Sequence, residues 1–163
     1  MSSPNSSRPV RSLPALTVPL LLALLALPWS VQTFVGGSPT YLFPWGLLNS
    51  DPFGVTTLSD FLFVYTAGLP DYIYAWPLSV LFYLLALGLA AVGPVLGYED
   101  GRVVAGLLAA ASVAQLTVAQ GFSVQPGRAA WPVGTALLLG AAAYVYFGGR
   151  RGDENTDGDA TEP

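Results

Sequence analysis

The sequence contains no cysteine, no histidine and no lysine, and only 10% of its 163 residues are charged. Without cysteine there are no disulfides and no thiolate chemistry, and without histidine the commonest metal ligand and proton carrier is missing. No Asp, Glu or Arg lies inside any long apolar run, so those runs also lack the usual proton relays and ion-coupling carboxylates. We therefore expect no catalytic residue, no metal and no cofactor. No glycine-rich phosphate loop follows a strand, and no nucleic-acid partner is expected.

Long apolar runs are what the sequence has in abundance. A helix needs roughly 20 apolar residues to cross a hydrocarbon core of about 30 Å. Four runs reach that length, and we predict an all-α membrane protein whose four transmembrane helices span about 13–35, 75–96, 103–122 and 129–147. A signal peptide is the alternative interpretation of the first run. A retained helix is preferred because residues 27–30 supply no good small-x-small cleavage site.

The arginines are unevenly distributed around these runs. Short loops that carry arginine tend to face the cytoplasm, whereas acidic residues have little influence on orientation. Arg128 alone lies on the opposite side from the other five arginines, so we predict a multi-pass protein of the cell membrane with both termini in the cytoplasm. The five arginines on the predicted cytoplasmic side are Arg8, Arg11, Arg102, Arg150 and Arg151.

The two ends of the chain flank the predicted transmembrane domain of residues 13–147. Residues 1–12 and 148–163 are predicted to be disordered cytoplasmic segments, and the second is an acidic tail without an apolar anchor. The tail carries half of all the acidic residues, namely Asp153, Glu154, Asp157, Asp159 and Glu162. With a pI near 4.4 and no lysine, this composition indicates adaptation to a high-salt cytoplasm.

The predicted outer loop, residues 36–74, is rich in aromatic residues and proline. Thr57 and Asp60 have the spacing of a capping box, with aspartate in the place of the usual Glu or Gln. Gly68 and Pro70 supply a stop, so a short helix is predicted over about 58–67. This helix is apolar on nearly all sides and should lie in the outer membrane interface. The loop is interpreted as a surface segment, and a lid over a ligand cavity is the alternative.

Small and polar residues within the runs provide the candidate functional positions. Close helix packing is predicted where small residues recur every four positions. Buried polar side chains would join helices by hydrogen bonds or line a polar substrate path. The candidate packing residues are Gly106, Ala110, Ala114, Ala136 and Gly140, and the candidate intramembrane polar residues are Ser112, Gln115 and Gln120. In the outer loops, Arg128 is predicted to pair with Asp60 or Asp71.

The distinctive part of the sequence runs from Leu58-Ser59-Asp60-Phe61-Leu62 through Thr66-Ala67-Gly68-Leu69-Pro70 to Ala75-Trp76-Pro77-Leu78. These segments resemble an uncharacterised family of small haloarchaeal multi-spanning membrane proteins. The resemblance extends from the first to the fourth apolar run. It implies an archaeal origin and a membrane location, and it supplies no activity and no functional residues.

Three functions are compatible with these features. The first is a non-catalytic integral membrane protein that packs with itself or with another membrane protein in the lipid bilayer. The second is a component of a transport system, in which Gln115, Gln120 and the outer loop line a polar path. The third is a membrane-embedded enzyme that uses the outer-loop carboxylates Asp60 or Asp71.

Overall fold

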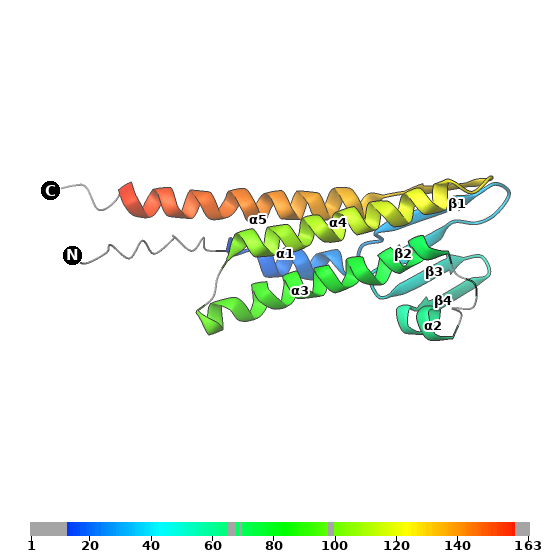
Figure 1. The fold of residues 1–163 in the computed structure, drawn as a ribbon, viewed down its shortest axis with the longest axis horizontal. Coiled ribbons are helices and arrows are strands. Elements are labelled where there is room, and N and C mark those ends of the chain that lie inside the picture. The colour runs from blue at the N-terminus through cyan, green and yellow to red at the C-terminus, as the bar shows by residue number, and fades with distance from the viewer. Residues whose placement is uncertain (1–12, 65–67, 69, 98–99, 159–163) are drawn as a thin grey trace.

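A five-stranded antiparallel sheet lies at one end of a group of long helices (Figure 1). The computed structural model describes residues 13–64, 68, 70–97 and 100–158. The predicted all-α architecture is wrong, because strands form within the first apolar run, within the loop that follows it and at the start of the fourth run. The protein is a mixed helix-and-sheet structure.

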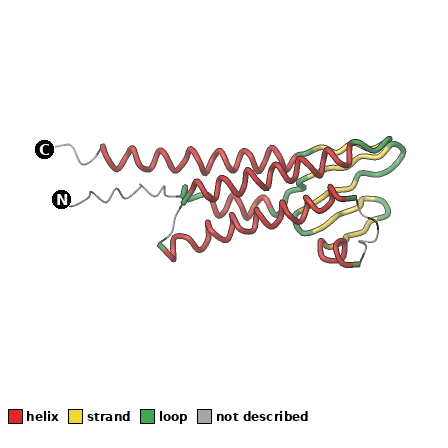
Figure 2. Tube along the Cα trace, viewed as in Figure 1, coloured by secondary structure: helices red, strands yellow, loops and turns green. Residues whose placement is uncertain are grey.

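The sheet is formed by five short strands in the order β4-β3-β2-β1-β5, and all neighbouring strands are antiparallel. The first four strands follow one another in the chain, whereas β5 comes from the connection between two long helices and pairs with β1 (Figure 2). Their bounds are Ser30–Phe34 for β1, Thr40–Phe43 for β2, Gly46–Ser50 for β3, Phe53–Thr57 for β4 and Arg128–Trp131 for β5.

The first apolar run does not continue as one helix. Helix α1 covers only Thr17–Leu24, and the chain then enters β1. Pro28 explains the interruption, because proline cannot donate a backbone hydrogen bond and disfavours helical geometry in the residue before it. The Trp29 N–H instead donates to the carbonyl of Leu42 at 2.7 Å, which joins this segment to β2.

The remaining helices follow the predicted runs more closely. They are α2 (Leu58–Phe63), the 3₁₀-helix η1 (Asp71–Tyr74), α3 (Ala75–Leu96), α4 (Gly101–Ser123) and α5 (Val133–Gly158). The second predicted run coincides with α3, and α4 extends slightly beyond the third. Helix α5 continues past residue 147 into the predicted acidic tail of residues 148–163. The predicted segment 1–12 and the last five residues of that tail, 159–163, lie outside the described residues.

The core is formed where α4 packs between α3 and α5. Ser79 Oγ on α3 donates to the Ala111 carbonyl on α4 at 2.8 Å, and Ser112 Oγ donates to the Thr135 carbonyl on α5 at 3.0 Å. The phenol of Tyr83 donates to the carbonyl of Leu21, which attaches α1 to the same layer. These side-chain hydrogen bonds fix the position of each helix along the axis of its neighbour.

Two helical segments among the described residues, and not four, are long and apolar enough to cross a membrane. They are Asp71–Leu96 and Gly101–Ser123, and the criterion is length and composition alone. Val133–Gly148 is apolar but shorter. The predicted arrangement of four transmembrane helices is therefore corrected, because the first run is divided between α1 and β1 and the fourth begins as β5.

Candidate ligand-binding site

A cavity of about 250 Å³ lies where the sheet meets the helices. Its floor follows from strand register, because residues two apart on a strand, and residues paired across strands, share one face of a sheet. Gln32 pairs with Thr40, Thr40 with Asn49, and Leu42 with Leu47. The sheet residues that line the cavity are Gln32, Phe34, Thr40, Leu42, Leu47 and Asn49.

The walls of the cavity come from four helical segments. The helical lining residues are Phe61 of α2, Ile73 of η1, Trp76 of α3, and Val118 and Phe122 of α4. Val118 and Phe122 are four residues apart, so they lie on the same face of α4. The lining therefore combines residues 32–76 with the last part of α4, which is distant from them in the chain.

Aromatic contacts hold the walls in place. The Trp76 indole N–H donates to the Phe43 carbonyl at 3.2 Å, and the ring of Phe61 meets the Trp76 ring edge to face with centroids 5.3 Å apart. On the other side, Phe122 packs in the same manner on Tyr72, with centroids 5.4 Å apart. These interactions fix the rotamers of two bulky side chains and so keep the space between them open.

The cavity is mostly apolar and carries no charge. None of its eleven lining residues is ionisable, and only Gln32, Thr40 and Asn49 are polar. Thr40 Oγ1 donates to Asn49 Oδ1 at 2.8 Å, so these two residues satisfy one another in part. An apolar cavity of about 150 Å³ already accommodates benzene. The cavity therefore has room for a somewhat larger uncharged molecule.

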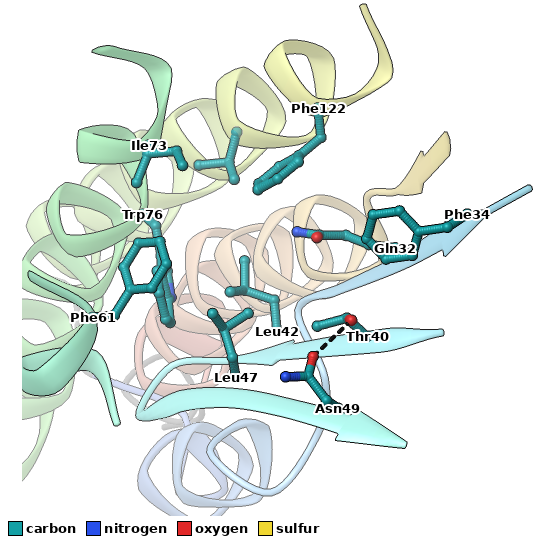
Figure 3. Close-up of a pocket in the computed structure, with 11 residues that line it drawn as sticks. Gln32, Phe34, Thr40, Leu42, Leu47, Asn49, Phe61, Ile73, Trp76 and Phe122 are labelled. Carbon is teal, nitrogen blue, oxygen red and sulfur yellow. Dashed lines mark hydrogen bonds between the residues drawn. The ribbon is translucent and has the colours of Figure 1, made fainter. Parts of the chain in front are cut away.

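Gln32 is the unusual member of the lining. Its side chain is only 4% exposed, and its Nε2 atom has no hydrogen-bond partner within the described part of the chain. In Figure 3 the amide extends into the space between Phe122 and Leu42. Buried amides normally find a partner, and leaving one without a partner costs about 1–3 kcal/mol. A hydrogen-bond donor directed into an apolar cavity is suited to an acceptor on a bound molecule.

The predicted packing residues divide into inner and outer positions. Ala114 is buried in the core, whereas Gly106, Ala136 and Gly140 are exposed, and Ala110 is half-buried. A Cβ atom added to Gly106 or Gly140 would meet nothing within 4 Å. Close approach occurs instead at Gly134, whose added Cβ would lie 2.6 Å from the Cβ of Trp29.

The three predicted polar residues of α4 also have different environments. Ser112 is buried and bonded to the Thr135 carbonyl, while Gln115 is buried with both amide atoms lacking a partner among the described residues. Gln120 is exposed. The structure therefore places Gln115, and not Gln120, on the interior side of the helix.

The predicted charge pair is replaced by other contacts. The guanidinium carbon of Arg128 lies 5.5 Å from the centre of the Phe34 ring, in a cation–π arrangement. Asp60 accepts from Thr57 Oγ1 at 2.8 Å through its carboxylate, and its backbone N–H donates to the same hydroxyl at 3.1 Å. Asp71 is exposed in the first turn of η1. None of the three lines the cavity.

The fold and the site define a small protein in which an antiparallel sheet closes an apolar cavity at the end of a helical layer. The chain belongs to the family described as a domain of unknown function (DUF8050), which matches residues 1–155. This agrees with the resemblance to an uncharacterised family. Comparison with curated proteins and with solved structures finds no match.

A ligand cavity beneath the outer loop was only the alternative interpretation of the sequence, and the sheet that forms its floor was not predicted, although one signal was present. The aromatic residues Tyr41 and Phe43 and the β-branched residues Val31 and Thr33 favour strands. A strand predicted over residues 30–34 would have divided the first apolar run, as the structure does, and would have placed Gln32 on one face of a sheet. The length of the run favoured a continuous helix instead.

Proposed function

We propose that this protein is a membrane-embedded binding protein that holds a small, uncharged, mainly apolar molecule in the cavity between its sheet and its helices. The observation that carries the proposal is the buried Gln32 amide, which extends into an apolar space and whose Nε2 atom has no hydrogen-bond partner among the described residues. A donor in that position provides orientation, and the apolar walls provide most of the binding energy. The uncharged lining favours binding over catalysis.

The outer surface of the helices supports the membrane location. Helix α3 has no charged residue over its 22 residues, and at about 1.5 Å per residue it matches a hydrocarbon core of about 30 Å. Exposed large apolar side chains run along its length, and such a surface is typical of contact with lipid. These side chains are Leu78, Leu81, Leu84, Leu85, Val92, Val95 and Leu96.

The charges at the two ends support an orientation. Arg102 begins α4 at the end away from the sheet, and α5 carries Arg150 and Arg151 toward that same end (Figure 1). Arg128 is on the sheet, at the opposite end. Under the positive-inside rule, the turn between α3 and α4 faces the cytoplasm and the sheet faces outward. The acidic composition and the lack of lysine support an origin in a high-salt archaeon.

The positions of the predicted polar and acidic residues argue against the two alternative functions, transport and catalysis. Gln115 is buried and Gln120 is exposed, so the two do not line one path of the kind expected for transport. Asp60 and Asp71 lie outside the cavity lining, so they have no enclosed site in which to act as catalytic groups. Both observations favour a binding protein.

Photolabelling of the purified protein in lipid nanodiscs tests the proposal. The probe is octan-1-ol carrying a mid-chain diazirine, which places a reactive carbon among the lining residues. We expect saturable labelling of cavity residues that excess octan-1-ol suppresses. Leu47→Phe should fill the cavity and reduce this labelling, whereas Leu81→Phe on the exposed side of α3 should not. Unsaturable labelling confined to exposed helix positions, unaffected by Leu47→Phe, would refute the proposal.

A further inference from the structure

The three polar residues that line the cavity lie in one row across the sheet. Gln32 of β1 pairs with Thr40 of β2, and Thr40 pairs with Asn49 of β3, so the three side chains share the inner face of the sheet. All other residues of the lining are apolar. The side-chain hydrogen-bonding groups of the lining are therefore concentrated in this row.

Two members of the row satisfy one another. Thr40 Oγ1 donates to Asn49 Oδ1 at 2.8 Å, which uses the hydroxyl proton of the threonine and the side-chain carbonyl of the asparagine. Gln32 lies outside this pair, and its buried Nε2 atom has no hydrogen-bond partner within the described part of the chain. A buried donor is normally bonded, so the group that this row lacks is an acceptor for Gln32.

The Gln32 amide lies part of the way along the cavity and not at one end of it. Phe34, the last residue of β1, is two positions from Gln32 and on the same face. Leu42 lies one row in the opposite direction on the neighbouring strand, and the indole of Trp76 is held beside it by the hydrogen bond to the Phe43 carbonyl. In Figure 3 the amide accordingly lies between Phe34 on one side and Leu42 and Trp76 on the other.

Aromatic rings mark both ends of the lining along the strands. At one end, the guanidinium carbon of Arg128 lies 5.5 Å from the centre of the Phe34 ring. At the other end, Phe61 meets Trp76 edge to face with centroids 5.3 Å apart. A molecule that fills the space between these rings extends past the Gln32 amide on both sides.

We propose that the cavity binds an uncharged carbonyl compound, such as a ketone, whose carbonyl group lies inside its chain and accepts a hydrogen bond from Gln32 Nε2. This inference rests on the proposed function and defines the class and the orientation of its ligand. A carbonyl oxygen accepts hydrogen bonds and carries no proton, so it meets the donor without adding another group that needs a partner. The apolar arms on either side of the carbonyl contact the apolar lining.

The size and the charge of the lining narrow the ligand further. At about 30 Å³ for each water-sized group, a volume of about 250 Å³ holds roughly eight such groups. None of the lining residues is ionisable, so a carboxylate or ammonium group would be buried without a counter-charge. Octan-4-one has a suitable length and an internal carbonyl. Octan-2-one is its isomer with the carbonyl next to the chain end, so the two differ mainly in where the acceptor lies.

The experiment measures how well each ketone suppresses labelling by the diazirine-bearing octanol, with the protein in lipid nanodiscs. Octan-4-one should compete about fivefold better than octan-2-one, because it alone can bond to Gln32 while filling both sides of the cavity. Gln32→Met keeps the length of the side chain and removes the donor, so the ratio should fall to about one. Leu81→Phe, a change on the exposed side of α3, should keep the original ratio.

The possible results separate the inference from the proposed function. Equal competition by the two ketones, with labelling still reduced by Leu47→Phe, would refute the internal carbonyl and leave the cavity as a binding site. A preference for octan-4-one that persists in both Gln32→Met and Gln32→Leu would show that Gln32 is not the donor. Stronger competition by octan-4-ol than by octan-4-one would refute the carbonyl group. If Leu47→Phe does not affect labelling at all, the proposed function itself fails.

Discussion

Gly134 and Trp29 are in closer contact than any larger residue at position 134 would allow. A Cβ atom on Gly134 would lie 2.6 Å from the Cβ of Trp29 and 2.8 Å from its carbonyl oxygen, which already accepts the Gly134 N–H at 2.6 Å. This contact attaches the first turn of α5 to the start of β1. It therefore joins the last long helix to the strand that carries Gln32.

Gly134→Ala should destabilise the protein by about 1–3 kcal/mol, because the backbone of Trp29 cannot move aside as a flexible side chain would. Denaturant unfolding in mild detergent measures the change. Gly140→Ala is the matched control on the same helix, since its added Cβ would meet nothing within 4 Å. Alanine is also the better helix former, so this control should be neutral or slightly stabilising. Equal effects of the two changes would contradict the importance of the contact.

The bond between Tyr83 and Leu21 gives a second prediction. Tyr83 is fully buried, its phenol donates to the Leu21 carbonyl, and its ring meets Trp29 edge to face at 5.0 Å. Tyr83→Phe should lower the unfolding free energy by about 1 kcal/mol, because one buried hydrogen bond is lost while the ring contact is kept. Tyr144→Phe on α5 removes an exposed hydroxyl and should have little effect. A Tyr83→Phe protein as stable as the original would show that the bond contributes nothing.

The long helices could be predicted from sequence because their signal is local. An uninterrupted apolar run of the right length, free of charge, fixes α3 and α4 almost to the residue. The cap at Thr57 is local as well, and the structure confirms that Thr57 accepts from the Asp60 N–H at the start of α2. The runs are formed by consecutive residues and the cap by residues three positions apart, so both signals can be found in the sequence itself.

The sheet and the cavity could not be predicted in this way, because they depend on partners that are distant in the chain. Strand β1 is stable as a strand only because β2 and β5 pair with its two edges, and β5 begins 94 residues after Phe34. Gln32 and Phe122 meet only after that pairing has formed. Arg128 shows the same limitation, since charge alone suggested an aspartate partner and the strand register instead places it opposite Phe34.

The N-terminal cap of α2 gives a local prediction. Thr57→Ala removes the hydroxyl that accepts from the Asp60 N–H and donates to the Asp60 carboxylate, and it should cost about 1 kcal/mol of local stability. Hydrogen exchange of residues 58–63 should become faster, while exchange in α4 stays the same. Thr57→Ser keeps the hydroxyl and should restore slow exchange. If the alanine and serine variants exchange equally fast, the hydroxyl is not the stabilising group.

The buried Nε2 atom of Gln32, which lacks a hydrogen-bond partner within the residues that the structure describes, predicts opposite effects of a substitution on stability and on binding. Gln32→Leu should stabilise the ligand-free protein by about 1–3 kcal/mol, because it removes a buried donor for which the described part of the chain supplies no acceptor. The same change should weaken binding of the octanol probe. Asn49→Leu should instead destabilise the protein, because it leaves the Thr40 hydroxyl without its acceptor. Unfolding midpoints and probe labelling are measured on the same samples. Destabilisation by Gln32→Leu would mean that the amide has a partner within the fold.

The orientation of the sheet can be tested with single cysteines, because the sequence has none of its own. Ser38→Cys places a thiol in the connection between β1 and β2, and Thr156→Cys places one near the end of α5, away from the sheet. In the proposed orientation the sheet faces outward. A thiol reagent that cannot cross the membrane should then label Ser38→Cys in intact cells and should label Thr156→Cys only after the cells are opened. The unmodified protein is the background control.

The reverse pattern would invert the proposed orientation. Equal labelling of both cysteines in intact cells would place the two ends on the same side and rule out a membrane between them.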